Sequence, residues 1–226
     1  MEIVLASRNK HKIVEMNTLL SGVCDELKVL SLDDIGFMGD IEEGGESFEE
    51  NSKIKAAVPA EYGYIGIADD SGLSVDSLGG APGVYSARYA GEPCDDKKNN
   101  DKLICELEKV GDNKRDASFV SVVSILFPKG SELHSFDESL LEYGILVVDE
   151  KSKARGFLCR GECPGKILYE ERGTGGFGYD PLFYCELDKT FAELTPDEKN
   201  SISHRAKAMK AFTHDLARII KQKEKK

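Results

Sequence analysis

The sequence lacks the features that mark membrane-spanning and zinc-binding proteins. No run in it approaches the roughly 18 consecutive apolar residues of a membrane-spanning helix, and residues 1–6 are too short and too acidic for a signal peptide. No CxxC pair occurs, so zinc is not expected and the thiols are expected to be reduced. The cysteines are Cys24, Cys94, Cys105, Cys159, Cys163 and Cys185. We therefore expect a cytoplasmic protein without a membrane partner.

Positive charge is also scarce. The chain has 30 Lys and Arg against 41 Asp and Glu, which gives a net charge of −11. A charge of this sign argues against binding to duplex nucleic acid or to an anionic membrane surface. A small polyanionic ligand would need a local group of Lys and Arg, or a divalent cation, to overcome the repulsion. The apolar fraction of 40% suffices for one sizeable domain or for two lobes that share a core.

Hydrophobic periodicity and turn residues predict alternating strands and helices. Strands are expected at residues 2–6, 28–32, 65–68, 119–127, 144–148, 157–159, 167–169 and 182–184. Helices are expected at residues 11–20, 47–58, 95–110 and 201–221. Ser47 with Glu50 fits a capping box, and Pro164 with Gly165 is expected to form a turn between two short strands. The mixture predicts an α/β fold with a mixed sheet.

Two adjacent carboxylates, Asp69 and Asp70, follow the predicted strand at 65–68. Carboxylates at a strand end can hold a hard cation by oxygen ligation. In an extended segment the two side chains point to opposite faces, so one can bind metal while the other anchors the loop or prepares a water molecule. A pair of turn carboxylates without a catalytic role is the alternative interpretation.

A second candidate site lies between the first predicted strand and the first predicted helix. Ser7, Asn9 and Lys12 offer a hydroxyl, an amide and an ammonium group, which bind phosphate at strand-to-helix turns. Taken by itself, the pattern is more typical of a helix N-cap followed by a surface lysine.

The glycine-rich segment at 173–178 formally matches the dinucleotide-binding pattern GxGxxG. That pattern must open a helix after a strand, whereas Pro181 disfavours helical geometry at Asp180. No P-loop spacing occurs elsewhere in the chain. We interpret the segment as a loop whose aromatic and acidic side chains, Phe177, Tyr179 and Asp180, can stack on a base and accept hydrogen bonds from its edge.

A basic cluster lies near the start of the last predicted helix. His204 and Arg205, with Lys199 upstream, place positive charge where it opposes the helix dipole. A bound anion or carbonyl group would explain this placement, and ordinary solvated charge is the alternative.

Taken together and in this order, these segments resemble the inosine triphosphate pyrophosphatase family, the Ham1-like non-canonical purine NTP pyrophosphatases. The most specific segments are residues 68–89, which begin Ala-Asp-Asp-Ser-Gly-Leu, and residues 175–181, Gly-Gly-Phe-Gly-Tyr-Asp-Pro. The other matching segments are residues 7–12, 48–56 and 199–205. The resemblance therefore spans nearly the whole chain.

The resemblance implies a fold and an activity. The fold is an elongated α/β domain over residues 1–226, with a long twisted mixed sheet flanked by helices and two lobes around a substrate groove. Members of the family usually form homodimers. They hydrolyse the purine nucleoside triphosphates ITP, dITP and XTP at the α–β phosphoanhydride with Mg²⁺, which gives the monophosphate and pyrophosphate and cleanses the nucleotide pool.

The resemblance also implies roles for individual residues. Glu43 and Asp70 match the metal-ligand positions, and Asp70 also matches the assigned base. The phosphate-binding positions are Ser7 to Lys12, which include Asn9, together with Lys55 and Lys199. Ser71 matches a substrate contact, and the base pocket matches Phe177, Gly178, Tyr179, Asp180, His204 and Arg205. Because a carboxylate bound to Mg²⁺ is a poor base, Asp69 remains a second catalytic candidate.

Residues 129–150 form a longer stretch than the family typically shows, and we expect a surface insertion there. Two other function classes stay open at this point. A nucleotidase or sugar-nucleotide hydrolase could use the same metal site but would release different products. A non-catalytic nucleotide-binding module would show no turnover with Mg²⁺.

Overall fold

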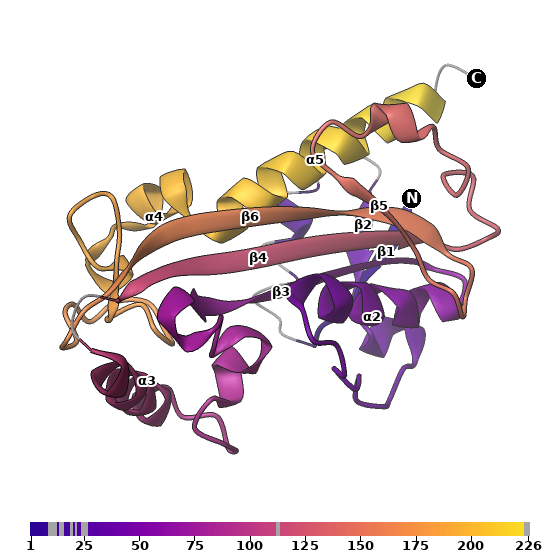
Figure 1. Ribbon diagram of the computed structural model, residues 1–226. Helices are drawn as coiled ribbons and strands as arrows, with labels where there is room; N and C mark the ends of the chain where they lie inside the picture. The colour runs from indigo at the N-terminus through magenta and orange to yellow at the C-terminus, as the bar shows by residue number, and fades with distance from the viewer. Residues whose placement is uncertain are drawn as a thin grey trace. The chain divides into compact units, whose positions relative to one another are not determined.

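A mixed β-sheet flanked by helices organises the chain (Figure 1). The computed structural model describes residues 1–8, 13, 16–18, 20, 22–23, 27–111 and 114–223. The strands are β1 (Glu2–Leu5), β2 (Lys28–Leu30), β3 (Ile65–Val75), β4 (Asp116–Phe127), β5 (Ile145–Val148), β6 (Arg155–Ile167) and β7 (Phe183–Tyr184). Their order is β2-β1-β3-β4-β6-β5, and β7 pairs with β6. The predicted α/β class with a mixed sheet is confirmed.

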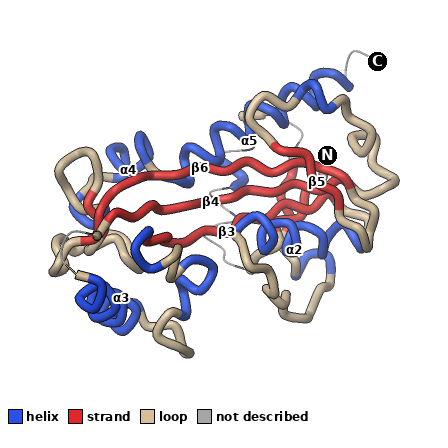
Figure 2. Tube along the Cα trace, viewed as in Figure 1, coloured by secondary structure: helices blue, strands red, loops and turns tan. Residues whose placement is uncertain are grey.

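The sheet combines parallel and antiparallel pairs. β1 pairs parallel with β2 and with β3, whereas β5 and β7 pair antiparallel with β6. The helices are α2 (Phe48–Glu61), α3 (Asp96–Val110), α4 (Pro196–Ile202) and α5 (His204–Lys223). Short 3₁₀ helices lie at η1 (Asp33–Ile35), η2 (Asp76–Leu78), η3 (Gly83–Arg88), η4 (Glu138–Leu140) and η5 (Phe191–Glu193). Figure 2 shows helices and strands by colour.

Three of the four predicted helices have clear counterparts in α2, α3 and α5. The fourth, predicted over 11–20, falls half on residues outside those that the structure describes, and its described residues 13, 16–18 and 20 are helical. Of its apolar positions, Met16 and Leu20 are buried in a core. No helix within the described ranges is long and apolar enough to cross a membrane. The cysteines of the described ranges, five in number, are free thiols.

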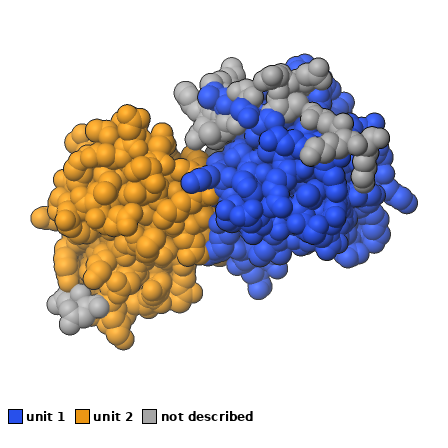
Figure 3. All heavy atoms as spheres, turned by 90° about the horizontal axis from the view of Figure 1, so that it is seen from above, with its two compact units in different colours: residues 1–70, 122–160, 208–226 blue, residues 71–121, 161–207 orange. Residues whose placement is uncertain are grey.

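The chain divides into two compact units (Figure 3). Unit 1 comprises residues 1–70, 122–160 and 208–226, and unit 2 comprises residues 71–121 and 161–207. The boundaries fall inside β3, β4, β6 and α5. Each unit has a hydrophobic core of its own, and the substrate groove that the resemblance implies stays a prediction.

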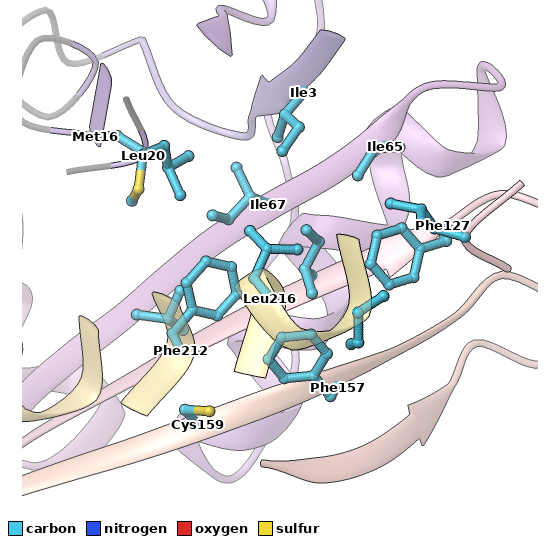
Figure 4. Close-up of a cluster of buried hydrophobic side chains, with 14 of the residues drawn as sticks. Ile3, Met16, Leu20, Ile65, Ile67, Phe127, Phe157, Cys159, Phe212 and Leu216 are labelled. Carbon is cyan, nitrogen blue, oxygen red and sulfur yellow. The ribbon is translucent and has the colours of Figure 1, made fainter. Parts of the chain in front are cut away.

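The main core of unit 1 lies between sheet strands and helix α5 (Figure 4). Ile3 of β1 and Ile67 of β3 face inward from the sheet, and Phe212 and Leu216 contribute from α5. These side chains are fully buried. In α5 the buried positions recur at helical spacing, so apolar periodicity explains why this helix packs as it does.

The core of unit 2 is rich in aromatic side chains. Leu103 and Leu107 of α3 are fully buried within it. The rings of Phe119 and Phe183 lie 4.5 Å apart, and those of Phe119 and Phe191 lie 5.3 Å apart. Val110, three residues after Leu107, is 37% exposed and is the last residue of the helix.

The prediction of a short strand at 65–68 was wrong. β3 continues through Asp69 and Asp70 to Val75, so the two carboxylates lie within a strand and not after its end. The reason is that Leu73 and Val75 are buried in the core of unit 2, which keeps the backbone extended. The polar pair was taken for the end of the strand because local polarity does not show what lies further along the chain.

The predicted turn at Pro164–Gly165 was also wrong. β6 runs from Arg155 to Ile167 without interruption. Pro164 lies on the exposed face, and Gly165 is needed because a Cβ there would collide with the carbonyl oxygen of Tyr184 on β7. Proline at an exposed position and glycine at a close backbone approach are compatible with a strand.

The expected capping box of α2 is half formed. Ser47 Oγ accepts from the Glu50 N–H at 3.2 Å, as predicted. The Glu50 carboxylate, however, accepts from the Glu46 N–H at 2.7 Å and not from Ser47. A complete capping box, which the sequence analysis missed, lies at the start of α4 between Thr195 and Glu198.

Residues 129–150 are not merely a surface excursion. Leu133 and Phe136 are buried in the core of unit 1, and β5 pairs with β6. The fully buried carboxylate of Asp215 on α5 accepts from the N–H groups of residues 142, 143 and 144 at 2.7 to 3.1 Å. Whether this segment is an insertion relative to the family stays a prediction.

Candidate active site

The parallel pairing of β1 with β3 brings two predicted site segments to one edge of the sheet. Leu5 is in register with Ile67, and the Ala6 N–H donates to the Ile67 carbonyl at 2.8 Å. Ser7 follows β1 directly, and Asp69 comes two residues after Ile67 on β3. β1 ends here, while β3 continues to Val75. Ligand sites commonly lie outside the carboxyl ends of parallel strands, so the end of β1 beside β3 is a candidate location for phosphate and metal binding.

Helix α2 lies close against β3 because residue 66 is glycine. A Cβ at Gly66 would collide with the carbonyl oxygen of Ala56. Ser52 Oγ donates to the Ala68 carbonyl oxygen at 3.1 Å and fixes the helix along the strand. This packing places Lys55 of α2 beside Asp70 of β3.

Lys55 lies between the two predicted metal-binding carboxylates. Its Nζ is 2.6 Å from Asp70 Oδ1 and 3.3 Å from Glu43 Oε1. The Lys55 and Asp70 side chains are only 12% and 11% exposed. Asp70 Oδ2 is buried and has no hydrogen-bond partner in the ranges that the structure describes. The cluster therefore presents one carboxylate oxygen that a further ligand or cation can satisfy.

Burial and charge oppose each other in this cluster. Burial raises the pKa of Asp70 above its ordinary value, and Lys55 only partly compensates. Burial alone would lower the pKa of Lys55, but the carboxylates of Asp70, Glu43 and Asp69 outweigh it and raise that pKa. The charged form of Lys55 is therefore favoured, whereas the ionised form of Asp70 is held at a cost that an additional cation would reduce.

The loop that carries Glu43 is tied to the first turn of α2. The Gly45 N–H donates to Asn51 Oδ1 at 2.9 Å, and the Glu46 N–H donates to Glu50 as described above. Asn51 is fully buried. Asn51 lies in the segment 48–56 that resembles the family, but no role was predicted for it. Its buried position in the first turn of α2 explains how the loop is held near Lys55.

A divalent cation of the Mg²⁺ type fits the groups present. Mg²⁺ usually binds one or two protein carboxylates and takes further oxygens from phosphate and water. Glu43 and Asp70 both contact Lys55 Nζ, so their carboxylates converge, and Asp70 has an oxygen without a hydrogen bond. In the described ranges no group of three or more His, Cys, Asp and Glu forms a complete protein cage. Asp69, next along β3, is equally buried.

A second cluster, in unit 2, contains Asp180 and Phe177 of the predicted base-pocket residues, together with Lys199. Asp180 is 3% exposed, and its Oδ2 accepts from Lys199 Nζ at 2.6 Å and from the Phe177 N–H at 3.0 Å. Lys199 Nζ also lies 5.5 Å from the ring centroid of Phe177 and 5.1 Å from that of Phe191. Phe177 itself is 68% exposed. An exposed ring therefore lies beside a buried ion pair.

The tight loop around Phe177 depends on glycine at two positions. Gly176 has a φ of +76°, and a Cβ there would collide with the Asp180 carboxylate. Gly178 has a φ of +60°. Side chains are strained at such angles, so the Gly-Phe-Gly pattern is a requirement of this loop and not a mark of nucleotide-binding helix geometry.

A comparison with known proteins identifies the family. The family model of the Ham1 family matches residues 3–215. The chain belongs to the Ham1 family. The dITP/XTP pyrophosphatase of Clostridium perfringens is 42% identical to it over 228 residues, which cover 97% of this Ham1 chain and 99% of that protein. The dITP/XTP pyrophosphatase of Desulforamulus reducens is 43% identical over 226 residues, with coverages of 99% and 100%.

Solved Ham1 structures are similar to this chain as well. A HAM1 protein from Coxiella burnetii matches with a TM-score of 0.80 and 38% identity, covering 96% of this chain and 98% of that one. The Ham1 protein of Staphylococcus aureus matches with a TM-score of 0.79 and 35% identity, and the match again covers 96% of this chain and 98% of that one. The Ham1 fold is thus supported by sequence and by structure.

The remaining predicted residues of this Ham1 chain have different surroundings. Tyr179 is 4% exposed and its hydroxyl donates to the Ser86 carbonyl oxygen at 2.8 Å, so its side chain belongs to the core of unit 2. The His204 ring stacks on Phe119 at 4.9 Å. Arg205 and Ser71 are partly exposed. Their substrate contacts stay predictions.

Lys199, one of the predicted phosphate-binding residues, lies in unit 2. Its contacts are Asp180 and two aromatic rings of unit 2. Asn9 and Lys12, the other members of the phosphate set, lie outside the described residues. Of that set, the structure describes Ser7, Arg8 and Lys55 in unit 1.

Two residues of α3 that the sequence analysis missed contact the Phe177 loop. Asp96 Oδ2 accepts from the Gly178 N–H at 2.7 Å, and Asn100 Nδ2 donates to the Gly178 carbonyl oxygen at 3.2 Å. A signal was present, because Asn100 precedes Leu103 by three residues and so lies on the apolar face of the helix. A buried amide at such a position calls for hydrogen-bond partners.

Proposed function

We propose that this Ham1 chain hydrolyses the non-canonical purine nucleoside triphosphates ITP, dITP and XTP to the monophosphate and pyrophosphate. The observation that carries the proposal is its identity of more than 40%, over nearly the full length of both chains, with proteins named dITP/XTP pyrophosphatase. The buried Lys55, Asp70 and Glu43 cluster supports it, because it combines the charges that a triphosphate and its cation require.

The residues of unit 1 are proposed to act on the phosphates. Lys55 holds Asp70 through Oδ1, which orients the carboxylate and leaves Oδ2 for a cation. The ammonium group of Lys55 can also pair with a phosphate oxygen, as cations do in phosphate sites. Ser7, at the adjacent end of β1, offers a hydroxyl, whereas its backbone N–H donates to the Leu5 carbonyl oxygen at 2.7 Å.

Mg²⁺ is proposed as the cofactor, held by Glu43 and Asp70. When bound, it supplies positive charge that polarises the phosphoryl group and lowers the pKa of a bound water molecule. Asp70 is proposed as the catalytic carboxylate. Asp69, which faces the other side of the strand, is the second candidate for accepting the proton of the attacking water.

The residues of unit 2 are proposed to read the base. Phe177 stacks on the purine ring, and Asp180 accepts from N1–H, which hypoxanthine and xanthine carry and adenine lacks. Because Asp180 Oδ2 already accepts from Lys199 and Phe177, the accepting atom is Oδ1. His204 and Arg205 donate to the 6-oxo group. The homodimeric state and a cytoplasmic location are proposed on the family resemblance alone.

Product analysis on a substrate panel tests this proposal. With Mg²⁺, we expect pyrophosphate from ITP, XTP and dITP, poor turnover of GTP because of its 2-amino group, and still less of ATP. Discrimination between ITP and ATP should reach several powers of ten, about 10⁴-fold in kcat/KM, since the wrong base leaves buried polar groups unpaired.

Four outcomes would contradict parts of the proposal. Release of orthophosphate would identify a nucleotidase, and no turnover with Mg²⁺ at alkaline pH would favour a binding module. Equal kcat/KM for ATP and ITP would refute the account of the base pocket even if pyrophosphate were the product. Full activity in excess EDTA would refute the Mg²⁺ site.

A further inference from the structure

Helix α3 binds both backbone polar groups of Gly178, which follows Phe177 in the loop. Asp96 accepts from the Gly178 N–H at 2.7 Å, and Asn100 donates to its carbonyl oxygen at 3.2 Å. Asp96 and Asn100 are four residues apart, so they lie on one face of the helix, one turn from each other. A single regular element therefore determines where this part of the loop lies.

The hydrogen bonds that Asn100 donates to the loop region explain why an amide occupies this buried position. Its Nδ2 group also donates to Glu171 Oε1 at 3.1 Å. The residue is 3% exposed, and its Oδ1 has no hydrogen-bond partner among the residues that the structure describes. A buried acceptor without a partner costs free energy, whereas a leucine here would extend the apolar face of Leu103 and Leu107. Core packing therefore does not account for an amide at this position.

The loop needs anchors of this kind because its own sequence favours mobility. Gly176 and Gly178 have φ angles of +76° and +60°, and glycine loses more conformational freedom than other residues when it is ordered. Phe177 lies between them and is 68% exposed, so packing on its ring contributes little order. The Phe177 N–H is held by Asp180, and the anchors on Gly178 fix the backbone on the other side.

We propose that Asp96 and Asn100 are positioning residues that hold Phe177 and Asp180 in the geometry that reads the nucleobase. We call the hydrogen bonds of Asp96 and Asn100 with Gly178 the clamp. The role in base reading rests on the proposed function, whereas the clamp can be measured without turnover. A binding group that is ordered in advance loses less entropy when its ligand binds. Loss of the clamp should therefore weaken contacts to the base and spare contacts to a phosphate chain.

A single tryptophan gives a readout of loop mobility, because the chain contains none. In the Phe177→Trp protein, fluorescence anisotropy reports the mobility of residue 177, and quenching by IMP without metal reports base binding. We expect Asn100→Ala and Asp96→Ala to lower the anisotropy and to weaken IMP binding roughly 10- to 100-fold, the scale expected for a displaced binding group. Asp96→Asn keeps an oxygen acceptor and should restore most of both values.

Kinetics with the native Phe177 separate base contacts from phosphate contacts. Asn100→Ala should lower kcat/KM for ITP by roughly 10- to 100-fold and leave the Ki of inorganic tripolyphosphate unchanged. Asn99→Ala is the matched control. Asn99 is 2% exposed on the same helix, but it binds the Ala87 carbonyl oxygen and the Ala90 N–H instead. Asn99→Ala should lose similar stability with unchanged anisotropy, IMP binding and kcat/KM.

Each outcome decides either the clamp or the function. Unchanged anisotropy in Asn100→Ala, or equal losses of kcat/KM in Asn99→Ala and Asn100→Ala, would overturn the positioning role. Equal weakening of IMP and tripolyphosphate would overturn its specificity for the base. If the wild-type protein releases no pyrophosphate from ITP, the proposed function fails, and the anisotropy of the Phe177→Trp variants alone decides the clamp.

Discussion

The two groups of site residues are built in different ways. In unit 1, Lys55 and Asp70 lie on a helix and a strand, and their side chains are about nine-tenths buried. In unit 2, Phe177 lies on a loop between two left-handed glycines and is 68% exposed. Buried charges must be matched by partners at fixed positions, since an unpaired buried charge is costly. A stacking ring needs only a fixed plane, which a clamped loop can provide.

This difference predicts that changes in the charge cluster affect both activity and stability, whereas changes in the aromatic loop affect activity alone. Helices and strands that hold the charges also contribute to the core, so activity and stability are linked in the charge cluster. In the aromatic loop, activity and stability are separable. The following substitutions test the contrast, in order of decreasing expected effect on turnover.

Asp70→Asn should abolish turnover. Loss of one charged group at the reacting centre of a phosphoryl transfer reduces kcat by roughly 10³-fold or more. The protein should still fold but with a lower free energy of unfolding, because the amide leaves the buried Lys55 ammonium without its nearest counter-ion. Steady-state kinetics and thermal unfolding measure both effects. Glu61→Gln, which removes an exposed carboxylate of α2, is the control. Near wild-type kcat in Asp70→Asn would refute the catalytic assignment.

Lys55→Ala should reduce both activity and stability. A charge-assisted contact to phosphate contributes about 1.5 to 3 kcal/mol, which corresponds to roughly 10- to 100-fold in kcat/KM. Removing one partner of a buried ion pair costs about 3 kcal/mol or more of unfolding free energy. Urea unfolding measures this loss, and Mg²⁺ should restore part of it because it replaces the missing positive charge.

The control for that variant is Lys53→Ala, two residues earlier on α2. It should leave kcat/KM and the unfolding free energy near their wild-type values. Wild-type kinetics in Lys55→Ala would make that lysine a structural counter-ion only. A stability loss that Mg²⁺ does not reduce would contradict a shared cation site at Glu43 and Asp70.

Phe177→Ala should raise the KM for ITP without unfolding the protein. Stacking of a base on an aromatic side chain contributes about 1 to 3 kcal/mol, or roughly 10- to 100-fold in affinity. The ring is exposed, so Tm should not change. Tyr169→Ala, which removes another exposed ring of unit 2, should leave the KM unchanged. A large fall in Tm for Phe177→Ala would break the contrast between the two groups.

Asp215→Asn should lower stability with no effect on kcat. Burial opposes ionisation of Asp215, but hydrogen bonds from His214 and from the backbone of residues 142–144 outweigh it and hold the Asp215 pKa below 3.8. Weakening these bonds costs about 1.5 to 3 kcal/mol. This variant shows whether stability and activity are separable within unit 1, away from the charge cluster.

The pH dependence of that loss has a defined sign. A carboxyl group whose pKa is lowered by folding stabilises the protein above its unfolded pKa, and this contribution is lost as the pH falls through the folded pKa. The difference between wild type and Asp215→Asn in urea unfolding should therefore be full at neutral pH and shrink below pH 3.8. A difference that is constant down to the acid limit would contradict the assignment.

Local sequence patterns correctly predicted those helices and strands whose buried residues recur at regular spacing within the segment itself. The strand at 2–6, the helix at 95–110 and the strand at 119–127 were found because their apolar spacing is complete within each segment. The failures occurred where distant residues decide the outcome. β3 continues past Asp70 because Leu73 and Val75 enter another core, and β6 passes through Pro164 because β7 packs against Gly165.

The sequence by itself determined the family, the fold class and the identity of most candidate site residues, because motifs such as Asp69-Asp70-Ser71-Gly72 and Gly-Phe-Gly-Tyr-Asp-Pro are specific in type and order. Only the tertiary structure decided which of them are partners. Lys55 and Asp70 are fifteen residues apart, and Lys199 and Asp180 nineteen, while Asn100 and Gly178 are 78 apart. Such pairs depend on how helices pack against strands and loops, and no local pattern contains that information.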